Sequence, residues 1–255
     1  MPSLPELSVV LLCYRAEAEL ARVAGDLHDE LEAAGVPYEL VLVANYWPGR
    51  GDRTPEYAYE FAQDHENVVV VAKPKRGDMG FDLRSGLEEA TRDYLVYLDG
   101  DGQVPAPAAL HVYRSLSQTG AAVAKGRRHF REDGSVRSIT SLGFNVLFRV
   151  LFGSRGLWDV NGQPKGLTRE AYERLELRTN DWFTDAEILL KARAAGLEIV
   201  EVPVHFLAKR AEGSHVGLDT VWEFLVNMIR WRLGRHPAQQ PAPRRRARPV
   251  VRARR

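Results

Sequence analysis

The chain has 255 residues, 45% of them apolar, which is enough for one large domain with a substantial core. A single cysteine, Cys13, excludes an internal disulfide and favours a reducing compartment. The first residues lack the basic and apolar segments of a signal peptide, so none is expected. No apolar stretch approaches the ~20 residues of a membrane span.

The formal net charge of +1 conceals an uneven distribution. Residues 234–255 contain Arg235 and seven arginines from Arg244 to Arg255, and no acidic residue. Taking these eight from the 35 basic residues leaves 27 against 34 acidic ones, so the rest of the chain carries −7. The Pro-, Ala- and Arg-rich tail is expected to be disordered, with an anionic membrane surface as its candidate partner. No nucleic acid partner is expected.

Strands and helices are predicted to alternate four times in about the first 100 residues. Short apolar runs bounded by turn residues predict four buried strands, at residues 7–12, 38–43, 68–71 and 94–98. Helical spacing or capping signals predict a helix after each, at 17–34, from 54, at 81–91 and from 105. This alternation predicts an α/β fold, a Rossmann-like parallel sheet with helices on both faces.

The second half is less regular. We expect a strand at 121–124, a helix at 137–152, a turn at 160–165, a helix that follows 181–187 and runs to 195, and a strand at 198–202 that could continue at an edge. Residues 218–233 predict an amphipathic helix with a narrow polar stripe, which is either buried or lies in a bilayer interface. The expected divisions are therefore a main domain at 1–217, this helix at 218–233 and the disordered tail at 234–255.

Two aspartates follow the fourth predicted strand, in the run Tyr94-Leu-Val-Tyr-Leu-Asp99-Gly-Asp101-Gly-Gln103. Alternate carboxylates and an amide oxygen form a hard-oxygen cluster suited to Mg²⁺ or Mn²⁺. Ligands bind an open α/β sheet at the carboxyl ends of its strands, where Cys13, Tyr14 and Asn45 also fall. Three turns at one edge favour a nucleotide site, and a solvated Asp-Gly turn is the structural alternative.

Basic residues in the second half could hold an anionic substrate. Arg128 follows a predicted strand, and Arg137 and Ser141 lie four residues apart, hence on one helix face. The alternative is that these are ordinary surface side chains. Asp185 precedes a predicted helix and could be its cap, a general base or a substrate ligand, and the sequence alone favours the cap. For Cys13, packing in the core is favoured over a nucleophilic role.

Six motifs in order resemble glycosyltransferase family 2, and within it the dolichol-phosphate mannosyltransferase-like, or polyprenyl-phosphate glycosyltransferase, branch. The resemblance covers roughly residues 7–217. The motifs are Ser8–Tyr14, Gly80–Gly86, Tyr97–Gln103, Gly126–Arg128, Arg137 with Ser141, and Glu201–Val204 followed by Arg210, Gly213, Ser214 and His215.

This resemblance implies a glycosyltransferase A-type fold, a nucleotide-sugar donor, a divalent metal and inversion at the anomeric carbon. Polyprenyl phosphate is commonly the acceptor in this branch. The metal ligands implied are Asp99, Asp101 and Gln103. The catalytic residues expected are Asp101, Asp185, Arg128 and Arg137. The donor-binding residues expected are Cys13, Tyr14, Glu17, Asn45, Gly80, Asp99, Ser141, Arg210, Ser214 and His215.

The chain departs from the family pattern near the nucleotide base. Glu17 stands one position late, and Ala44-Asn45 replaces two aspartates before a longer loop that contains Trp47. His215 replaces a lysine. Because asparagine both donates and accepts hydrogen bonds, uridine or guanosine specificity does not transfer.

Three functions remain open at this point. The first is metal-dependent transfer of a sugar to a polyprenyl phosphate, the second is transfer to a hydroxyl acceptor with Asp185 as base, and the third is a catalytically silent nucleotide-binding protein. A phosphate acceptor is already anionic near neutral pH and needs no strong base, so positioning and metal stabilisation would suffice. We expect a cytoplasmic protein, with peripheral attachment to the inner face of the plasma membrane as an open alternative.

Overall fold

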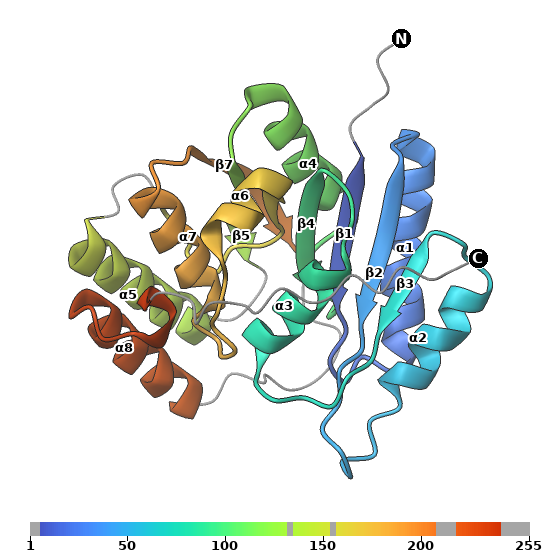
Figure 1. The fold of residues 1–255 in the computed structure, drawn as a ribbon, viewed down its shortest axis with the longest axis horizontal. Coiled ribbons are helices and arrows are strands. Elements are labelled where there is room, and N and C mark those ends of the chain that lie inside the picture. Colours follow the sequence, from blue (N-terminus) through green and yellow to red (C-terminus); the bar gives the residue numbers. More distant parts are fainter. Residues whose placement is uncertain (1–5, 132–134, 154–156, 208–217, 241–255) are drawn as a thin grey trace, which may run out of the picture.

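The computed structural model describes residues 6–131, 135–153, 157–207 and 218–240, except the side chains of 129–131, 135–142, 218, 219 and 221. In the first half, strands and helices alternate as the sequence predicts (Figure 1). The strands are β1 (Leu7–Leu12), β2 (Tyr38–Val43), β3 (Val68–Val71) and β4 (Tyr94–Asp99). The helices are α1 (Ala18–Ala34), α2 (Thr54–Gln63), α3 (Met79–Glu89) and α4 (Pro107–Thr119).

The second half contains a short strand and a short helix, at residues 165–168 and 169–175, that the sequence pattern does not predict. Its strands are β5 (Val123–Arg131), β6 (Lys165–Thr168) and β7 (Ile199–Phe206). Its helices are α5 (Ser135–Phe152), α6 (Arg169–Leu175), α7 (Thr184–Ala194) and α8 (Leu218–Arg232), followed by a 3-10 turn (Pro237–Gln239). The segment expected to be only a turn therefore leads into β6, which is too short and too polar to show a strand pattern.

The strands form one seven-stranded sheet in the order β3-β2-β1-β4-β6-β5-β7. Strand β1 pairs in parallel with β2 and β4, which confirms the parallel sheet predicted for the first half. Strand β6 runs antiparallel to both β4 and β5 and so joins the two halves. Leu12 lies opposite Asp99 in the register, so the carboxyl ends of β1 and β4 are side by side.

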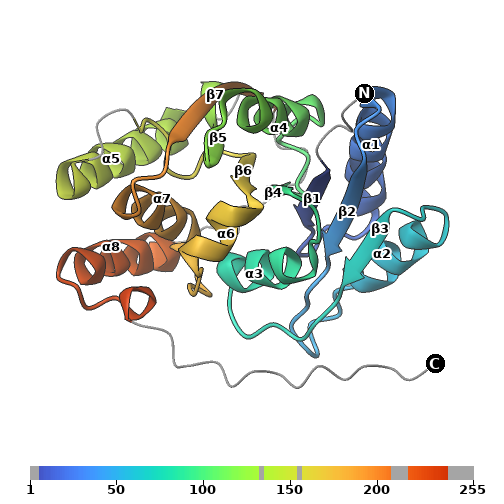
Figure 2. The same cartoon turned by 45° about the horizontal axis from the view of Figure 1, so that its top comes forward.

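Helices cover both faces of the sheet, as predicted. Val9 and Leu11 of β1 pack in one core with residues of α1 and α4, whereas Val10 packs in a second core with residues of α3 (Figure 2). Alternate residues of a strand point to opposite faces, and this explains the continuous burial of β1. Gly86 lets α3 approach closely, because a Cβ there would lie 2.5 Å from Cγ1 of Val10.

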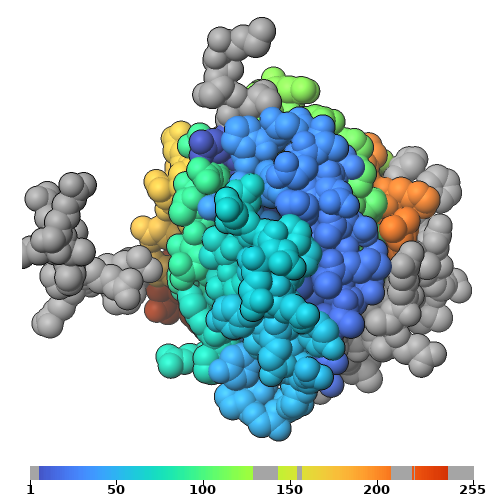
Figure 3. Space-filling model, turned by 90° about the vertical axis from the view of Figure 1, so that its right-hand side faces the viewer, coloured from blue at the N-terminus to red at the C-terminus, as the bar shows by residue number. Residues whose placement is uncertain are grey.

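Different helices form the two ends of the molecule. Helices α1 and α2 cover the end beside β3 (Figure 3), whereas α5 and α8 lie at the opposite end (Figure 1). Residues of α5, α7 and α8 enclose a third apolar core around Phe148, Phe224 and Met228. This core attaches α8 to the domain that carries the sheet.

Helix α8 is buried along one side, as one of the two predicted alternatives requires, and a place in a bilayer interface stays a prediction. Phe224 and Met228 are buried, whereas Trp222 and Ile229 are 69% and 55% exposed. Asn227, in the polar stripe, is buried as well. Among the helices of the described residues, none is long and apolar enough to cross a membrane.

The start of the C-terminal tail is ordered. Residues 237–239 form a 3-10 turn that His236 caps, and the His236 ring lies 5.0 Å from that of Phe183 and 5.1 Å from that of Trp231. The expectation of disorder is therefore wrong for residues 234–240, because this aromatic cluster anchors them. The arginines from Arg244 to Arg255 lie outside the described residues.

Candidate functional site

The turn that carries Asp99 and Asp101 packs against the end of β1. The N–H of Gly100 donates to the carbonyl oxygen of Leu12 at 2.8 Å, and a Cβ at Gly100 would lie 2.9 Å from that oxygen. Oδ1 of Asp101 accepts the N–H of Gln103 at 3.1 Å. The glycine thus permits a tight turn that places Asp99 and Asp101 at the carboxyl edge of the sheet.

Asp99 lies among other carboxylates. Its pKa is raised to about 7, chiefly by burial and then by the negative charges of Asp101 and Asp185, whereas Gln163 and Lys165 oppose the shift. The N–H of Asp99 donates to Oε1 of Gln163 at 2.7 Å. A divalent cation beside Asp99 and Asp101 would offset this repulsion.

The donor atoms at this turn fit Mg²⁺ or Mn²⁺. The carboxylates of Asp99 and Asp101 and the amide oxygen of Gln103 are hard oxygen ligands. In the described part of the chain, no three His, Cys, Asp or Glu side chains gather closely enough to hold a metal. Asp99 and Asp101 would therefore share the ion with the Gln103 oxygen and with substrate oxygens or water.

Asp185 lies in a buried network behind the Asp99 turn. Its Oδ1 accepts the hydroxyl of Tyr97 at 2.6 Å and lies 2.7 Å from Nζ of Lys165. The predicted helix cap is wrong, because Phe183 occupies the N-cap of α7 and no side chain caps the helix there. The carboxylate instead points to the buried cation, and the base and ligand roles stay predictions.

Arg128 is bound to a neighbouring carboxylate. Its Nε donates to Oδ2 of Asp159 at 2.6 Å, Nη2 donates to Oδ1 of the same group, and the Arg128 backbone N–H adds a third bond at 3.2 Å. These interactions lower the pKa of Asp159 in spite of its burial. A role for Arg128 in phosphate binding stays a prediction that would require it to share or leave Asp159.

Several predicted site residues cannot be compared with the rest. Arg137 and Ser141 lie on α5, but their side chains are not among those described. Arg210, Ser214 and His215 lie outside the described residues altogether.

Both polar atoms of the Asn45 side chain form hydrogen bonds within the protein. Its Nδ2 donates to Oδ1 of Asp82 at 2.9 Å, and its Oδ1 accepts the N–H of Lys73 at 2.8 Å. The other oxygen of Asp82 pairs with Nζ of Lys75, which lies 4.3 Å from the centre of the Tyr14 ring. Asn45 therefore links the end of β2 to the residues that support Tyr14.

The other residues predicted to bind the nucleotide-sugar donor are either buried or at the surface. Cys13 is 1% exposed, and burial raises the pKa of its thiol, so it packs in the core. Glu17 is exposed, and its backbone N–H donates to Oγ1 of Thr54 at 3.1 Å. A Cβ at Gly80 would lie 2.6 Å from the carbonyl oxygen of Thr179, so this glycine permits close backbone packing.

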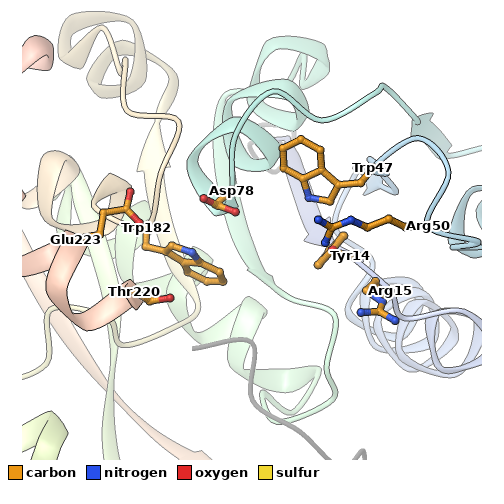
Figure 4. Close-up of a pocket in the computed structure, with 8 residues that line it drawn as sticks. All are labelled: Tyr14, Arg15, Trp47, Arg50, Asp78, Trp182, Thr220 and Glu223. Carbon is orange, nitrogen blue, oxygen red and sulfur yellow. The ribbon is translucent and has the colours of Figure 1, made fainter. Parts of the chain in front are cut away.

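A pocket of about 380 Å³ lies between the two halves of the chain (Figure 4). Tyr14 and Trp47 line one side, Trp182 and residues of α8 line the other, and Asp78 lies between them. The complete lining is Tyr14, Arg15, Trp47, Arg50, Asp78, Trp182, Thr220 and Glu223. Tyr14 follows Cys13, whose Cα would lie 3.4 Å from a Cβ at Gly100, so the Asp99 turn is close to the segment that leads to this pocket.

Sequence reasoning missed several residues of this region. Gln163 and Asp159 act on Asp99 and Arg128 from far along the chain, and no local pattern identifies them. Trp47 carried a signal, because it lies in the unusually long loop after β2. Trp182 and Glu223 could not be assigned to one pocket before the fold was known.

Residues 8–175 match the family model described as Glycosyl transferase family 2. Dolichyl-phosphate beta-glucosyltransferase ALG5A of Trichomonas vaginalis is 24% identical over 243 residues, which are 90% of this chain and 73% of that protein. Glycosyltransferase AglD of Haloferax volcanii is 28% identical over 210 residues, which are 80% of this chain and 33% of that protein. These matches confirm the predicted family and are consistent with its polyprenyl-phosphate branch.

Solved structures share the fold. Glucosyl-3-phosphoglycerate synthase from Mycobacterium tuberculosis, in complex with Mn²⁺, uridine diphosphate and phosphoglyceric acid, superposes with a TM-score of 0.68 at 19% identity. The match covers 90% of this chain and 79% of that one. Mannosyl-3-phosphoglycerate synthase from Rubrobacter xylanophilus has a TM-score of 0.65 at 17% identity, covering 90% of this chain and 74% of that one. The predicted glycosyltransferase A-type fold is confirmed.

Proposed function

Because the chain belongs to glycosyl transferase family 2, we propose that it moves a sugar from a nucleoside-diphosphate donor to a polyprenyl phosphate, with inversion and with Mg²⁺ or Mn²⁺. The observation that carries this proposal is the turn that sets Asp99 and Asp101 at the sheet edge beside Tyr14. A metal ion bound there would neutralise charge on the departing diphosphate.

The pocket beside this turn suits a nucleoside. Tyr14 and Trp47 offer aromatic faces on which a base could stack, and Arg15 and Arg50 offer hydrogen-bond donors. The guanidinium of Arg50 lies 5.8 Å from the centre of the Trp47 ring, which pre-orients both groups. With the base in this pocket, the diphosphate would extend across β1 toward Asp99 and Asp101.

The environment of Asp185 supports a phosphate acceptor. A hydroxyl acceptor must lose a proton to a base, whereas a polyprenyl phosphate is already anionic. Oδ1 of Asp185 accepts the hydroxyl of Tyr97 and pairs with Lys165, so this oxygen already has two partners inside the protein. The name of the Trichomonas vaginalis relative, a dolichyl-phosphate glucosyltransferase, supports the same acceptor class.

An exposed apolar surface supports attachment to a membrane, where a polyprenyl phosphate would reside. We call it the α5–α8 surface, and its exposed side chains are Val146, Leu147, Val150, Trp222, Ile229 and Leu233. Helices α5 and α8 contact each other and lie side by side (Figures 1 and 2). Exposed Arg230, Arg232 and Arg235 lie on the same helix and just beyond it, so basic groups are close in sequence to these apolar side chains. Apolar and basic signals together favour reversible attachment to an anionic membrane, here on its cytoplasmic face.

The test is a transfer assay with the full chain. Labelled uridine- and guanosine-diphosphate sugars are incubated with and without polyprenyl phosphate, with Mg²⁺ or with excess chelator, and lipid-linked sugar is measured. We expect product only with both the lipid and the metal. Asp101→Ala should abolish it while the protein stays folded, whereas Asp93→Ala, at an exposed carboxylate outside the site, should not. Full activity of Asp101→Ala would contradict the metal assignment.

The acceptor class is tested at Asp185. With a phosphate acceptor, Asp185→Asn should keep activity within about tenfold of the original, once corrected for the folded fraction. With a hydroxyl acceptor, loss of the base should lower the rate by about 10²–10⁴. A loss of that size in a folded variant would favour the hydroxyl acceptor.

A further inference from the structure

The polar stripe of α8 faces the loop that carries Trp182. Nδ2 of buried Asn227 donates to Oδ2 of Asp181 at 2.8 Å. Glu223, one turn earlier, lies near enough to Asp181 for the charge of that carboxylate to raise the pKa of Glu223. Two side chains of α8 thus meet one carboxylate, while the opposite face of the helix is exposed at Trp222 and Ile229.

The same loop supports the start of α3. Oδ1 of Asp181 accepts the N–H of Phe183 at 2.9 Å, which fixes the turn around Trp182. The carbonyl oxygens of Asn180 and Asp181 accept the N–H groups of Asp78 and Gly80, at 2.7 and 3.1 Å. Most of the first N–H groups of a helix lack partners within it, so the loop satisfies donors that α3 cannot.

These contacts converge on the pocket. Asp78 from the start of α3, Trp182 from the loop, and Thr220 and Glu223 from α8 all line it (Figure 4). Asp185 follows Trp182 by three residues, so the loop also leads into the buried ion pair. A shift of the loop would therefore move one wall of the pocket together with the helix start that faces it.

We propose that Asn227 and Asp181 are positioning residues, through which α8 holds the Trp182 loop and the start of α3 in the arrangement that binds the nucleotide donor. The proposal rests on the proposed function, because it takes the pocket as the donor site. Helix α8 is then part of the binding machinery as well as the element that bears the exposed apolar face. Loss of the contact should loosen the pocket wall and leave the sheet intact.

The chain allows an exchange of the two side chains as a test. Asn227→Asp removes the N–H donor and places a second carboxylate against Asp181. The variant therefore loses a hydrogen bond and adds a repulsion between like charges. In the double variant Asp181→Asn with Asn227→Asp, the new asparagine can donate to the new aspartate and still accept the N–H of Phe183. The exchange should therefore restore the loop. Arg232→Ala, an exposed position on the same helix, is the matched control.

The first measurement is hydrogen exchange of the backbone N–H groups of Asp78, Gly80, Phe81 and Phe183, with global unfolding followed separately. Asn227→Asp should speed exchange at these groups at least tenfold, and the double variant and Arg232→Ala should match the original protein. Unchanged exchange in a folded Asn227→Asp protein, or no recovery in the folded double variant, would overturn the proposal. This outcome does not depend on whether the chain transfers sugar.

The second measurement is the affinity for uridine and guanosine diphosphates with Mg²⁺. We expect Asn227→Asp to weaken binding about tenfold, which is the scale of one lost buried hydrogen bond. The double variant should recover the original affinity. Equal nucleotide affinity in all variants, despite faster hydrogen exchange in Asn227→Asp, would contradict the role in binding the nucleotide donor. If the original chain binds no nucleotide, the donor-binding role falls together with the proposed function, and the exchange data then report on the contact alone.

Discussion

The ammonium group of Lys165 lies 2.7 Å from Oδ1 of Asp185, and both side chains are buried. Burial lowers the pKa of Lys165, and the Asp185 carboxylate opposes that shift. Lys165 belongs to β6 and Asp185 to α7, and both influence the pKa of Asp99 in β4. The pair therefore joins three elements behind the candidate metal site.

Lys165→Met should destabilise the protein strongly, because it leaves the Asp185 carboxylate buried without its cation. Breaking one partner of a buried pair typically costs about 3–5 kcal/mol of unfolding free energy. Urea unfolding at pH 7 measures this. Lys73→Met is the control, because Lys73 pairs with Glu89 at an exposed position and should cost under ~1 kcal/mol. Similar small losses in both variants would show that the buried pair is not important for stability.

Glu223 should make the protein less stable as the pH rises toward 7. Burial and the charges of Asp181 and Asp78 raise its pKa to about 7, above the ~4.3 of an unfolded chain. Between these values the folded state keeps a proton that the unfolded state loses, so the free energy of unfolding falls with pH. Glu223→Gln should have a flatter profile from pH 5 to 8 and be more stable than the original at pH 8. Glu198→Gln, at an exposed position, should keep the original profile.

Two helix glycines should respond oppositely to alanine. A Cβ at Gly86 would lie 2.5 Å from Val10 Cγ1 and 2.6 Å from Val43 Cγ2, so Gly86→Ala should overpack the core and cost about 1–3 kcal/mol. A Cβ at Gly25 meets nothing within 4 Å, so Gly25→Ala should stabilise α1 by about 0.5–1 kcal/mol. Urea midpoints of both variants check the pair, and a change of the same sign in both would contradict the packing argument.

The α5–α8 surface should bind anionic vesicles in a salt-sensitive manner. Removing the chain after Gln240 keeps the described residues and removes seven arginines, each contributing about 1 kcal/mol near an anionic surface. Sedimentation of the truncated chain, and of Trp222→Ser with Ile229→Ser, should therefore show weaker binding. Tyr59→Ser is the control, an exposed aromatic change on α2 at the other end of the molecule. No binding of the full chain at low salt would contradict membrane attachment.

The sequence predicts the parts of the fold that depend on local patterns. Strand β1 reads as a continuous apolar run because it is buried on both faces. Strand β6 escapes prediction because two of its four residues, Lys165 and Thr168, are polar. Lys165 is buried only because Asp185, 20 residues later in the chain, supplies the opposite charge.

The same distinction between local patterns and distant partners applies to the candidate site. Asp99 and Asp101 are identifiable because a turn interrupts an apolar strand, which is a local signal. The partner of Arg128 is 31 residues away, and the hydroxyl of Tyr97 reaches Asp185 across 88 residues. Helix-cap preference applied to Asp185 fails because the carboxylate finds a stronger, non-local partner.

Strand β6 also bears on the order in which the chain assembles. Strands β1 to β4 are synthesised first. About 65 more residues must then be synthesised before β6, which pairs with the outer edge of β4, is present. An unpaired apolar edge is a template for other chains. During synthesis, this interval is therefore when the protein is most prone to aggregate. A chain ending between β4 and β6 should precipitate instead of accumulating as a soluble half.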